Sequence, residues 1–403
     1  MNVVAVKVRW SIPFNRGILE LGKYMKLLHT ADWHLGKSFR GLSLLEDQRF
    51  ILDQILDAAK SHEVDVLILA GDVYDKPSPP EGAVSLFRHF LERFYAETDA
   101  AFVAIAGNHD SGHRLGVFEK LLDPKRILIR GPLQAEEPAL ILEDEHGSVA
   151  FSAVPYGEIY AARRVFEDES IQTPEDVLRA ELEAARKAVP QGARWVVSAH
   201  AFVTGGLPSD SERPLAVGRV ETVSNNLFDG AAYVALGHLH RSQQVGSETI
   251  RYSGSPLVFD FDEAGSQKSC MIVDLDSDGV SHMEQIDLHP VRKVREVRGL
   301  LADLLIEAEK EPSEDYLRAV LLDEGALVDP VSQLRPFYPN VMQVQREKKQ
   351  DMVLGKAGRA TSKLSDPSAV ISEFVEFVRG EAVSDGEDGV IHSLLGEPVR
   401  EDV

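Results

Sequence analysis

The stretch KLLHTADWH (residues 26–34) sets the pattern from which the fold can be argued. A short apolar run ends abruptly in Asp32 and His34, so a buried strand is expected to deliver polar side chains at its carboxyl end. The same pattern returns in VDVLILAGD (residues 64–72) and in AFVAIAGNHD (residues 101–110). Continuous apolar runs of this length are typical of strands that are covered on both faces.

Helical periodicity separates these predicted strands. Residues 45–59 and 82–95 place apolar side chains at helical spacing, with charged residues between them. The alternation of strand and helix predicts an α/β fold in which helices cover the faces of a sheet. The polar ends of its strands would then meet at one edge, where open α/β sheets bind ligands.

The rhythm changes in the second half of the chain. Residues 195–198 and 233–236 are predicted strands, and each is followed by histidine. Residues 248–289 predict short strands with a hairpin turn at residues 276–279. Beyond this point the pattern mixes helix, strand and turn, which indicates a smaller α+β domain.

The length of 403 residues allows two or three domains. We expect a main domain over residues 25–290 and a smaller one over 291–378. Residues 1–24 lack the apolar core of a signal peptide and are predicted to be an N-terminal extension, either disordered or preceding the true start. Residues 379–403 are strongly acidic and are predicted to be a solvated tail.

Composition excludes several classes of protein. The formal net charge of −22 argues against coating of nucleic acid or anionic membrane by bulk attraction, although it leaves room for a nuclease with a locally cationic site. The single cysteine, Cys270, excludes an intrachain disulfide and a cysteine zinc site, and it lies in a predicted buried strand. No apolar run reaches the roughly 18–20 residues of a membrane-spanning helix, so we expect a cytoplasmic protein.

Five polar clusters end predicted strands, and one alone is a weak signal, because Asp at a strand end is more often a cap or a turn former. Together they supply carboxylates, imidazoles and a carboxamide, which manganese, iron and zinc prefer as ligands. The clusters are DWH (32–34), GDVYD (71–75), GNHD (107–110), SAH (198–200) and GHLH (237–240). The candidate metal ligands in them are Asp32, His34, Asp72, Asn108, His200, His238 and His240.

Seven protein ligands exceed what one ion needs and therefore predict two ions with a bridging carboxylate. Two divalent ions roughly 3.5–4 Å apart can activate water at neutral pH and neutralise both moving oxygens of a phosphate ester. The predicted chemistry is phosphoester hydrolysis.

These five blocks, in this order, resemble the calcineurin-like metallophosphoesterase superfamily. TADWHLGK (30–37), AGDVYD (70–75), YSGSP (252–256) and LRPFYPNV (334–341) are similar to the SbcD-type nuclease subunits within it. The likeness spans about residues 25–349. It implies a two-sheet β-sandwich flanked by helices, with a smaller α+β domain that caps the site.

The resemblance also implies roles for single residues. One ion would be held by Asp32, His34, Asp72 and His240, and the other by Asp72, Asn108, His200 and His238. His109 would be the catalytic residue that is not a ligand, oriented by Asp110. Asp75 could have an indirect or only structural role, and Arg40 and His113 could contact phosphate or only line the surface.

The implied activity is a DNA exonuclease on duplex ends and an endonuclease on single strands and hairpins, in DNA repair and recombination. Manganese is the expected metal, with magnesium, iron or zinc as alternatives. The implied partner is an SbcC-type ABC/SMC-like ATPase, with a homodimer inside a heterotetramer. HLGKS (34–38) is not an ATP-binding loop, because Ala31 occupies the position of its first glycine.

Two alternatives remain open. The first is a calcineurin-like phosphodiesterase or phosphatase that acts on a nucleotide or phosphoprotein. The second is a scaffold without catalysis, which is disfavoured because no ligand is missing. Residues 335–363 carry seven basic and two acidic residues, which is either a DNA-backbone contact or a solvated face.

Overall fold

The computed structural model describes residues 24–117, 119–136, 138–209, 212, 222–347, 371–372, 375 and 383–395. Of the expected extension over residues 1–24, residues 1–23 lie outside the described residues, as do the basic residues 348–363. The chain divides into two compact units, of which the first ends at Gln345. Of the second unit, the structure describes helix α9 (Asp385–Leu395), which the acidic composition of the tail did not predict.

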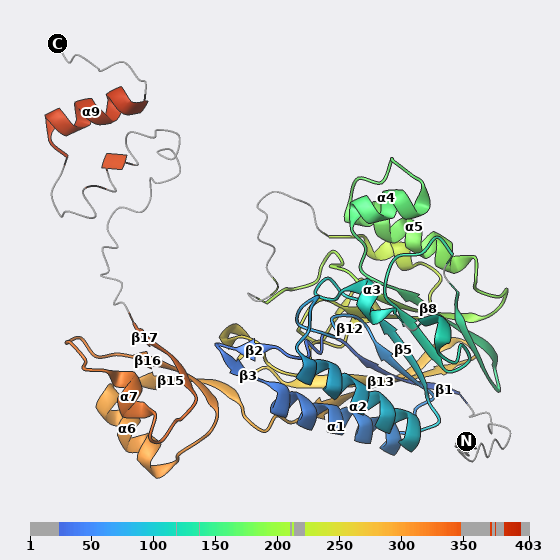
Figure 1. Cartoon of the computed structure of the whole chain (residues 1–403), viewed down its shortest axis with the longest axis horizontal. Coiled ribbons are helices and arrows are strands. Elements are labelled where there is room, and N and C mark those ends of the chain that lie inside the picture. Colours follow the sequence, from blue (N-terminus) through green and yellow to red (C-terminus); the bar gives the residue numbers. More distant parts are fainter. Residues whose placement is uncertain are drawn as a thin grey trace, which may run out of the picture. The chain divides into compact units, whose positions relative to one another are not determined.

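Two six-stranded sheets form the body of the first unit (Figure 1). In the first sheet β1, β4, β5 and β6 run parallel, and in the second sheet β8, β9, β10 and β12 run parallel. The first sheet has the order β14 (Gly279–Leu288), β13 (Lys268–Asp276), β1 (Met25–Thr30), β4 (Val66–Leu69), β5 (Ala101–Ile105) and β6 (Ile127–Arg130). The second has the order β11 (Gln243–Val245), β12 (Ser247–Tyr252), β10 (Tyr233–Gly237), β9 (Arg194–His200), β8 (Gly147–Val154) and β7 (Leu140–Asp144).

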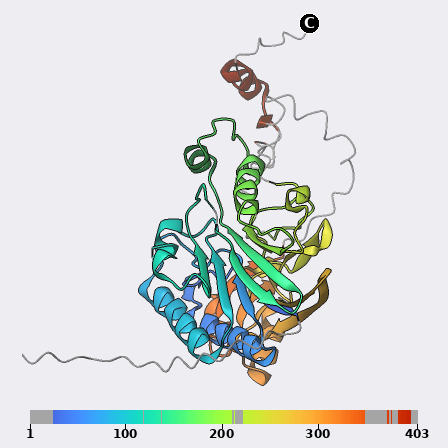
Figure 2. The same cartoon turned by 90° about the vertical axis from the view of Figure 1, so that its right-hand side faces the viewer.

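Helices cover the outer face of each sheet, as Figure 2 shows after a quarter turn. Helices α1 (Leu45–Ser61) and α2 (Glu81–Glu97) pack on the first sheet, and α5 (Pro174–Arg186) packs on the second. The shorter helices are α3 (Gly112–Leu115) and α4 (Ile159–Phe166). The 3-10 turns are η1 (Glu119–Leu121), η3 (Asn225–Phe228) and η4 (Phe261–Glu263), and a small ribbon pairs β2 (Ser38–Phe39) with β3 (Leu42–Ser43).

Alternate residues of each strand face different cores. In β1, Leu27 points between the two sheets, whereas Leu28 packs against helices α1 and α2. In β10, Tyr233 and Ala235 face the first sheet, and Val234 faces the α5 side. Strands buried on both faces need apolar residues throughout, which explains the continuous apolar runs in the sequence. The predicted α/β sandwich is confirmed.

A three-stranded sheet follows the sandwich and belongs to the same compact unit. It contains β15 (Val294–Gly299), β16 (Tyr316–Leu321) and β17 (Val341–Arg346), together with helices α6 (Leu301–Lys310) and α7 (Pro330–Leu334). Its junction with the sandwich is polar and buried: the Tyr316 hydroxyl donates to Asp47 Oδ2 at 2.9 Å, and Arg292 lies 3.0 Å from the same oxygen. The predicted domain boundary at residue 290 therefore lies within one compact unit, between two parts that pack against each other.

Two smaller expectations can be compared with the structure. Cys270 is free and buried in strand β13, which confirms the prediction for this thiol. The predicted hairpin turn connects β13 to β14, where Asp276 pairs with Gly279. Among the helices that the structure describes, none combines the length and apolar character needed to cross a bilayer.

Candidate metal centre

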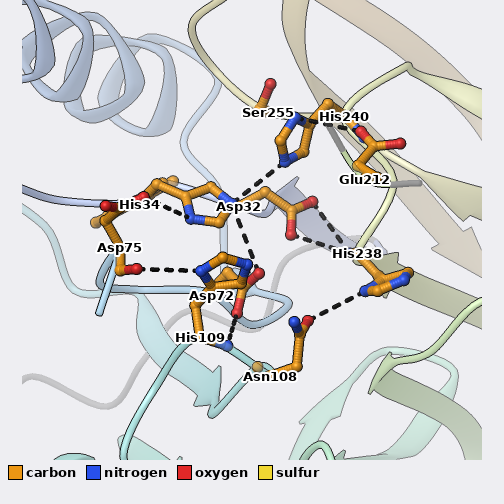
Figure 3. A network of polar contacts seen from close by, with 12 residues as sticks. Asp32, His34, Asp72, Asp75, Asn108, His109, Glu212, His238, His240 and Ser255 are labelled. Atoms are coloured by element: carbon orange, nitrogen blue, oxygen red, sulfur yellow. Dashed lines mark hydrogen bonds and ion pairs between the residues drawn. The ribbon is translucent and has the colours of Figure 1, made fainter. Parts of the chain in front are cut away.

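The strand ends of both sheets meet at one edge of the sandwich, and the polar clusters lie there (Figure 3). The loops after β1 and β4 run side by side and continue the sheet by hydrogen bonds. The amide of Asp32 donates to Gly71 O at 3.1 Å, and that of His34 donates to Asp72 O at 2.9 Å. These bonds fix the two loops relative to each other, so their side chains are positioned by backbone.

Two glycines let these loops approach their neighbours closely. A Cβ added to Gly71, whose φ is +91°, would lie 2.1 Å from His200 Nδ1. A Cβ added to Gly107 would lie 2.1 Å from Asp72 Oδ1. Both distances are far inside van der Waals contact, so a larger residue at either position would displace a predicted ligand. The glycines beside the polar clusters therefore permit the close approach of backbone and ligands.

Several predicted ligands adopt left-handed backbone conformations. The φ angles are 53° for Asp32, 44° for His34, 46° for Asp72 and 107° for His238. Residues other than glycine rarely adopt positive φ, and each such residue costs of order 1–3 kcal/mol. Strained residues concentrated at one edge are typical of a functional site. No sequence pattern indicated this strain.

Helix α1 supports the loop after β1 through one buried side chain. The Gln48 amide nitrogen donates to the carbonyl oxygen of His34 at 2.7 Å, and its oxygen accepts from the amide of Gly36 at 3.0 Å. Sequence analysis assigned residues 45–59 to a helix but gave Gln48 no role. A polar residue on the apolar face of that helix was the available signal.

Asp72 lies between two groups of imidazoles. Its Oδ2 atom is 3.5 Å from His34 Nε2 and 3.5 Å from His200 Nε2. On one side, His34 Nε2 lies 3.2 Å from His240 Nε2, so these two rings point their nitrogens at the same space. One carboxylate oxygen therefore faces donors from both sheets, as expected of a bridging ligand.

The other side of Asp72 gathers the carboxamide. The Asn108 Oδ1 atom lies 2.9 Å from His200 Nε2 and 3.1 Å from His238 Nδ1. The opposite nitrogen of His200, Nδ1, lies 3.0 Å from the carbonyl oxygen of Ala70. Because a carbonyl oxygen only accepts, Nδ1 carries a hydrogen, so Nε2 is the nitrogen that would bind a cation.

Asp32 lies at the centre of this edge. Its carboxylate accepts the backbone N–H of His238 at 2.9 and 3.2 Å. Asp32, Asp72 and His200 place ligand atoms within 4.8 Å of one another, as do His34, Asp72 and His109. The assignment of Asp32 to the same ion as His34 stays a prediction.

Burial controls the charges of the site. It raises the pKa of Asp32 to about 7 and lowers the pKa of His238 to about 3. Burial likewise lowers the pKa of His34 well below its usual value, so this ring is neutral near pH 7. Burial alone would raise the pKa of Asp72. The charge of His200 and the hydrogen bond between the two side chains hold the pKa of Asp72 below its usual range. Against burial, Asp72 raises the pKa of His200 to about 9.

The residues present fit divalent cations. Buried carboxylates, a carboxamide and imidazoles converge on the space around Asp72, and this mixture of oxygen and nitrogen donors suits manganese, iron or zinc. The two buried carboxylates repel each other without a cation between them. Two ions that share Asp72 would use both groups of donors.

His109 and Asp110 lie in the loop after β5. The backbone N–H of His109 donates to Asp72 Oδ1 at 2.9 Å, and its ring Nδ1 lies 3.1 Å from the carbonyl oxygen of Asp75. The carboxylate of Asp110 accepts backbone N–H bonds from Val73, Tyr74 and Gly107 at 2.8–3.0 Å. Asp110 thus holds the loop backbones together, whereas the Asp75 carbonyl orients the ring that Asp110 was expected to orient.

The remaining candidates occupy different surroundings. Asp75 Oδ1 accepts from Lys37 Nζ at 2.8 Å and lies 3.7 Å from His34 Nδ1. Arg40 is exposed in the turn between β2 and β3, with its Nη2 3.7 Å from Asp260. His113 is exposed on α3.

A buried polar group that the sequence patterns do not predict lies behind His240 and is formed by Glu212, Ser255, Glu263 and Lys268. Charged residues inside the otherwise apolar segment around β13 were the available signal.

Two family models match the chain. Residues 25–242 match the family model of the calcineurin-like phosphoesterases. Residues 290–379 match the SbcD_C model, described as the type 5 capsule protein repressor C-terminal domain.

Similar solved structures include GAP50, the anchor in the inner membrane complex of Plasmodium, at 11% identity and a TM-score of 0.41, covering 66% of this chain and 90% of that one. They also include a dimetal phosphatase from Danio rerio at 11% identity and a TM-score of 0.36, covering 66% of this chain and 100% of that one.

Proposed function

The chain belongs to the calcineurin-like phosphoesterase family as an SbcD-type metal-dependent phosphoesterase, and we propose that it hydrolyses DNA phosphodiester bonds with two metal ions. The observation that carries the two-metal part is the position of Asp72. Its Oδ2 atom lies 3.5 Å from an imidazole nitrogen on either side. A carboxylate oxygen placed between two sets of donors is what a shared ligand requires.

The proposed ligands divide between the two sides of Asp72. Asp32, His34 and His240 complete one set, and Asn108, His200 and His238 complete the other. When bound, two divalent cations lower the pKa of a water molecule and neutralise the charge of the phosphate. Manganese is the proposed metal, as the resemblance to SbcD-type nuclease subunits implies, and the mixture of carboxylate oxygen and imidazole nitrogen is compatible with it.

His109 is the proposed proton donor to the leaving oxygen. The Asp75 carbonyl accepts the hydrogen on its Nδ1, which leaves Nε2 as the nitrogen that exchanges a proton with the substrate. The backbone N–H bond to Asp72 ties the position of His109 to the metal ligands. Asp110 acts indirectly, by holding the loops after β4 and β5 in register.

The substrate and the partner rest on the second family match. The SbcD_C match over residues 290–379 supports duplex ends, hairpins and single-stranded DNA as substrates. As the resemblance to SbcD-type nuclease subunits implies, we further propose an SbcC-type ATPase partner in a heterotetramer with two copies of this chain, acting in the cytoplasm in DNA repair and recombination.

The test uses the full chain, stripped of metal and reloaded with Mn²⁺. Linear duplex and hairpin DNA are incubated with it, with and without the SbcC-type ATPase and ATP. We expect manganese-dependent shortening of the duplex from its ends and opening of the hairpin, both faster with the ATPase. A chain that leaves both DNAs intact under all these conditions would contradict the DNA part of the proposal.

The alternative is a phosphodiesterase or phosphatase of the same family that acts on a nucleotide or phosphoprotein. It shares the metal centre, so the comparison must vary the substrate. The same preparation is assayed on a cyclic nucleotide, on a phosphopeptide and on DNA at equal concentrations of phosphate ester. Faster turnover of either small substrate than of DNA would favour the alternative.

A further inference from the structure

A buried ion pair lies directly behind His240, outside the five polar clusters. Glu263 ends the 3-10 turn η4, and Lys268 begins strand β13. Lys268 Nζ lies 2.5 Å from Glu263 Oε2, and their side chains are only 5% and 0% exposed. Burial of two full charges is expensive unless other polar groups complete their bonding. The surroundings of the pair therefore indicate its purpose.

Lys268 is bonded on three sides. Besides Glu263, its ammonium group donates to the carbonyl oxygen of His240 and to the Ser255 hydroxyl, each at 3.0 Å. An ammonium group has three hydrogens, so these three acceptors use all of them. Lys268 thereby fixes the carboxylate of Glu263 and the backbone of His240 in one arrangement.

The second carboxylate oxygen of Glu263 reaches the ring of His240. Its Oε1 atom lies 3.0 Å from Nδ1, while Nε2 of the same ring faces His34 Nε2 at 3.2 Å. The Glu212 carboxylate lies on the Nδ1 side as well, at 3.2 Å. Ionised carboxylates only accept, so Nδ1 carries a hydrogen and Nε2 is the nitrogen that points into the site.

Phe259 limits rotation of both rings at this position. It packs edge-on against His34 and His240, with ring centroids 5.3 and 5.5 Å apart. Figure 3 shows His34 and His240 pointing toward each other and Glu212 behind His240. The orientation of His240 is thus set by packing on its face and by carboxylates at its outer nitrogen.

We propose that the Glu263–Lys268 pair is a positioning device that holds His240 with Nε2 toward the metal and increases its strength as a ligand. This rests on the proposed metal centre and deepens it. Carboxylates behind a ligating histidine fix its tautomer and raise its basicity, and their loss typically lowers metal affinity about 10–100-fold. Lys268 supplies the buried carboxylate with a counter-charge and keeps it aimed at the ring.

The two proposed ions would then differ. His200, on the opposite side of Asp72, is held at Nδ1 by the neutral carbonyl of Ala70. His240 is held by a charged carboxylate instead. Disruption of the Glu263–Lys268 pair should therefore weaken the ion on the His240 side and spare the ion on the His200 side.

The test is a calorimetric titration of metal-stripped full-length protein with Mn²⁺. The double variant Glu263→Leu with Lys268→Met removes both charges at similar volume, a change that buried pairs often tolerate. We expect one of the two affinities to fall about 10–100-fold and the other to stay within about threefold. The matched control Lys60→Met with Glu97→Leu removes an exposed pair on α1 and α2 and should change neither affinity.

A conservative variant separates positioning from simple stability. Glu263→Gln with Lys268→Met keeps an oxygen that can accept from Nδ1 but loses the charge, so it should recover only part of the lost affinity and leave a loss of about tenfold at one ion. A pair that only stabilises the fold would not sort the variants by this acceptor. If the Leu variant does not fold, Glu263→Gln alone serves, with an expected loss of about tenfold at one ion.

The outcomes are distinct. A folded double variant that binds both ions as tightly as the natural chain overturns the positioning role, and so does an equal loss at both ions. The variant His240→Gln tests the metal-ligand assignment on which the inference rests. If it leaves both affinities unchanged, the assignment of His240 as a ligand fails, and the inference fails with it. Loss at one ion in His240→Gln, but none in the double variant, refutes the positioning role while the metal centre stands.

Discussion

The two six-stranded sheets meet at one edge but bring different chemistry to it. The first sheet supplies the oxygen donors Asp32, Asp72 and Asn108, and one histidine, His34. The second sheet supplies three histidines, His200, His238 and His240. Neither sheet alone holds a complete donor set for two ions.

The backbones differ as well. Asp32, His34 and Asp72 of the first sheet all have positive φ, whereas among the three histidines of the second sheet only His238 does. His200 is still part of strand β9. The first sheet therefore accepts strain to bring carboxylates close together, whereas the second presents His200 from the end of a regular strand and His238 and His240 from the loop after β10. Bound ions would therefore relieve electrostatic repulsion chiefly between the carboxylates of the first sheet.

The largest effect is expected where the two sheets share a ligand. Asp72→Asn removes the carboxylate that faces both donor sets, so we expect loss of both ions and a fall in cleavage of roughly a thousandfold or more, since metal charge stabilisation is worth several kcal/mol. Calorimetry with Mn²⁺ and a DNA cleavage assay measure both. The exposed Asp57→Asn is the control. Binding of two ions by Asp72→Asn would contradict the role of Asp72 as a ligand shared between the two sheets.

The next effect separates chemistry from metal binding. His109→Gln should keep both ions, because the backbone N–H that binds Asp72 remains, but lose about a hundredfold or more in kcat with the proton donor gone. Cleavage assays and Mn²⁺ titration are compared with those of the exposed His89→Gln. Equal loss of metal in His109→Gln and Asp72→Asn would refute the assigned roles.

A buried histidine links the two sheets and makes their contact depend on pH. His29 of β1 bonds Tyr233 and Leu236 of β10, at 2.9 and 3.1 Å. Burial lowers its pKa from 6.5 to about 3, so below pH 6.5 the unfolded chain takes up a proton that the folded chain refuses. The free energy of unfolding should therefore fall by about 1.4 kcal/mol per pH unit between these values.

His29→Gln should remove this contribution and make stability less dependent on acid. Urea unfolding at several pH values between 4 and about 7 measures the difference in slope. His282→Gln, at an exposed position of β14, should keep the slope of the natural chain. A slope unchanged in His29→Gln would show that the contact between the sheets does not depend on this ring.

The smallest effect is expected at Asp75. The ring of His109 bonds the backbone carbonyl of Asp75, which Asp75→Asn keeps, while the carboxylate pairs with Lys37. We expect less than about a tenfold fall in kcat, in line with a partly exposed ion pair worth 1 kcal/mol or less. A loss as large as that of His109→Gln would mean that the carboxylate itself orients the ring.

The amino-acid sequence alone determined the fold class and the set of candidate ligands. Continuous apolar runs identify strands covered on both faces, and the polar clusters mark their ends, because both features depend on residues close in the chain. The identity of the ion-sharing residue could be argued only from resemblance. The helical tail segment α9 was missed, because acidic composition conceals a short helix.

Only the tertiary structure decided which side chains act together. The left-handed conformations of Asp32, His34 and Asp72, the Asp75 carbonyl behind His109 and the Glu263–Lys268 pair behind His240 all depend on contacts between residues distant in sequence. Local periodicity carries no information on such contacts. The sequence around a carboxylate at a strand end is the same whether that carboxylate binds metal, orients a histidine or holds a loop. Packing of the two sheets decides which residues surround each carboxylate, and these neighbours determine its role.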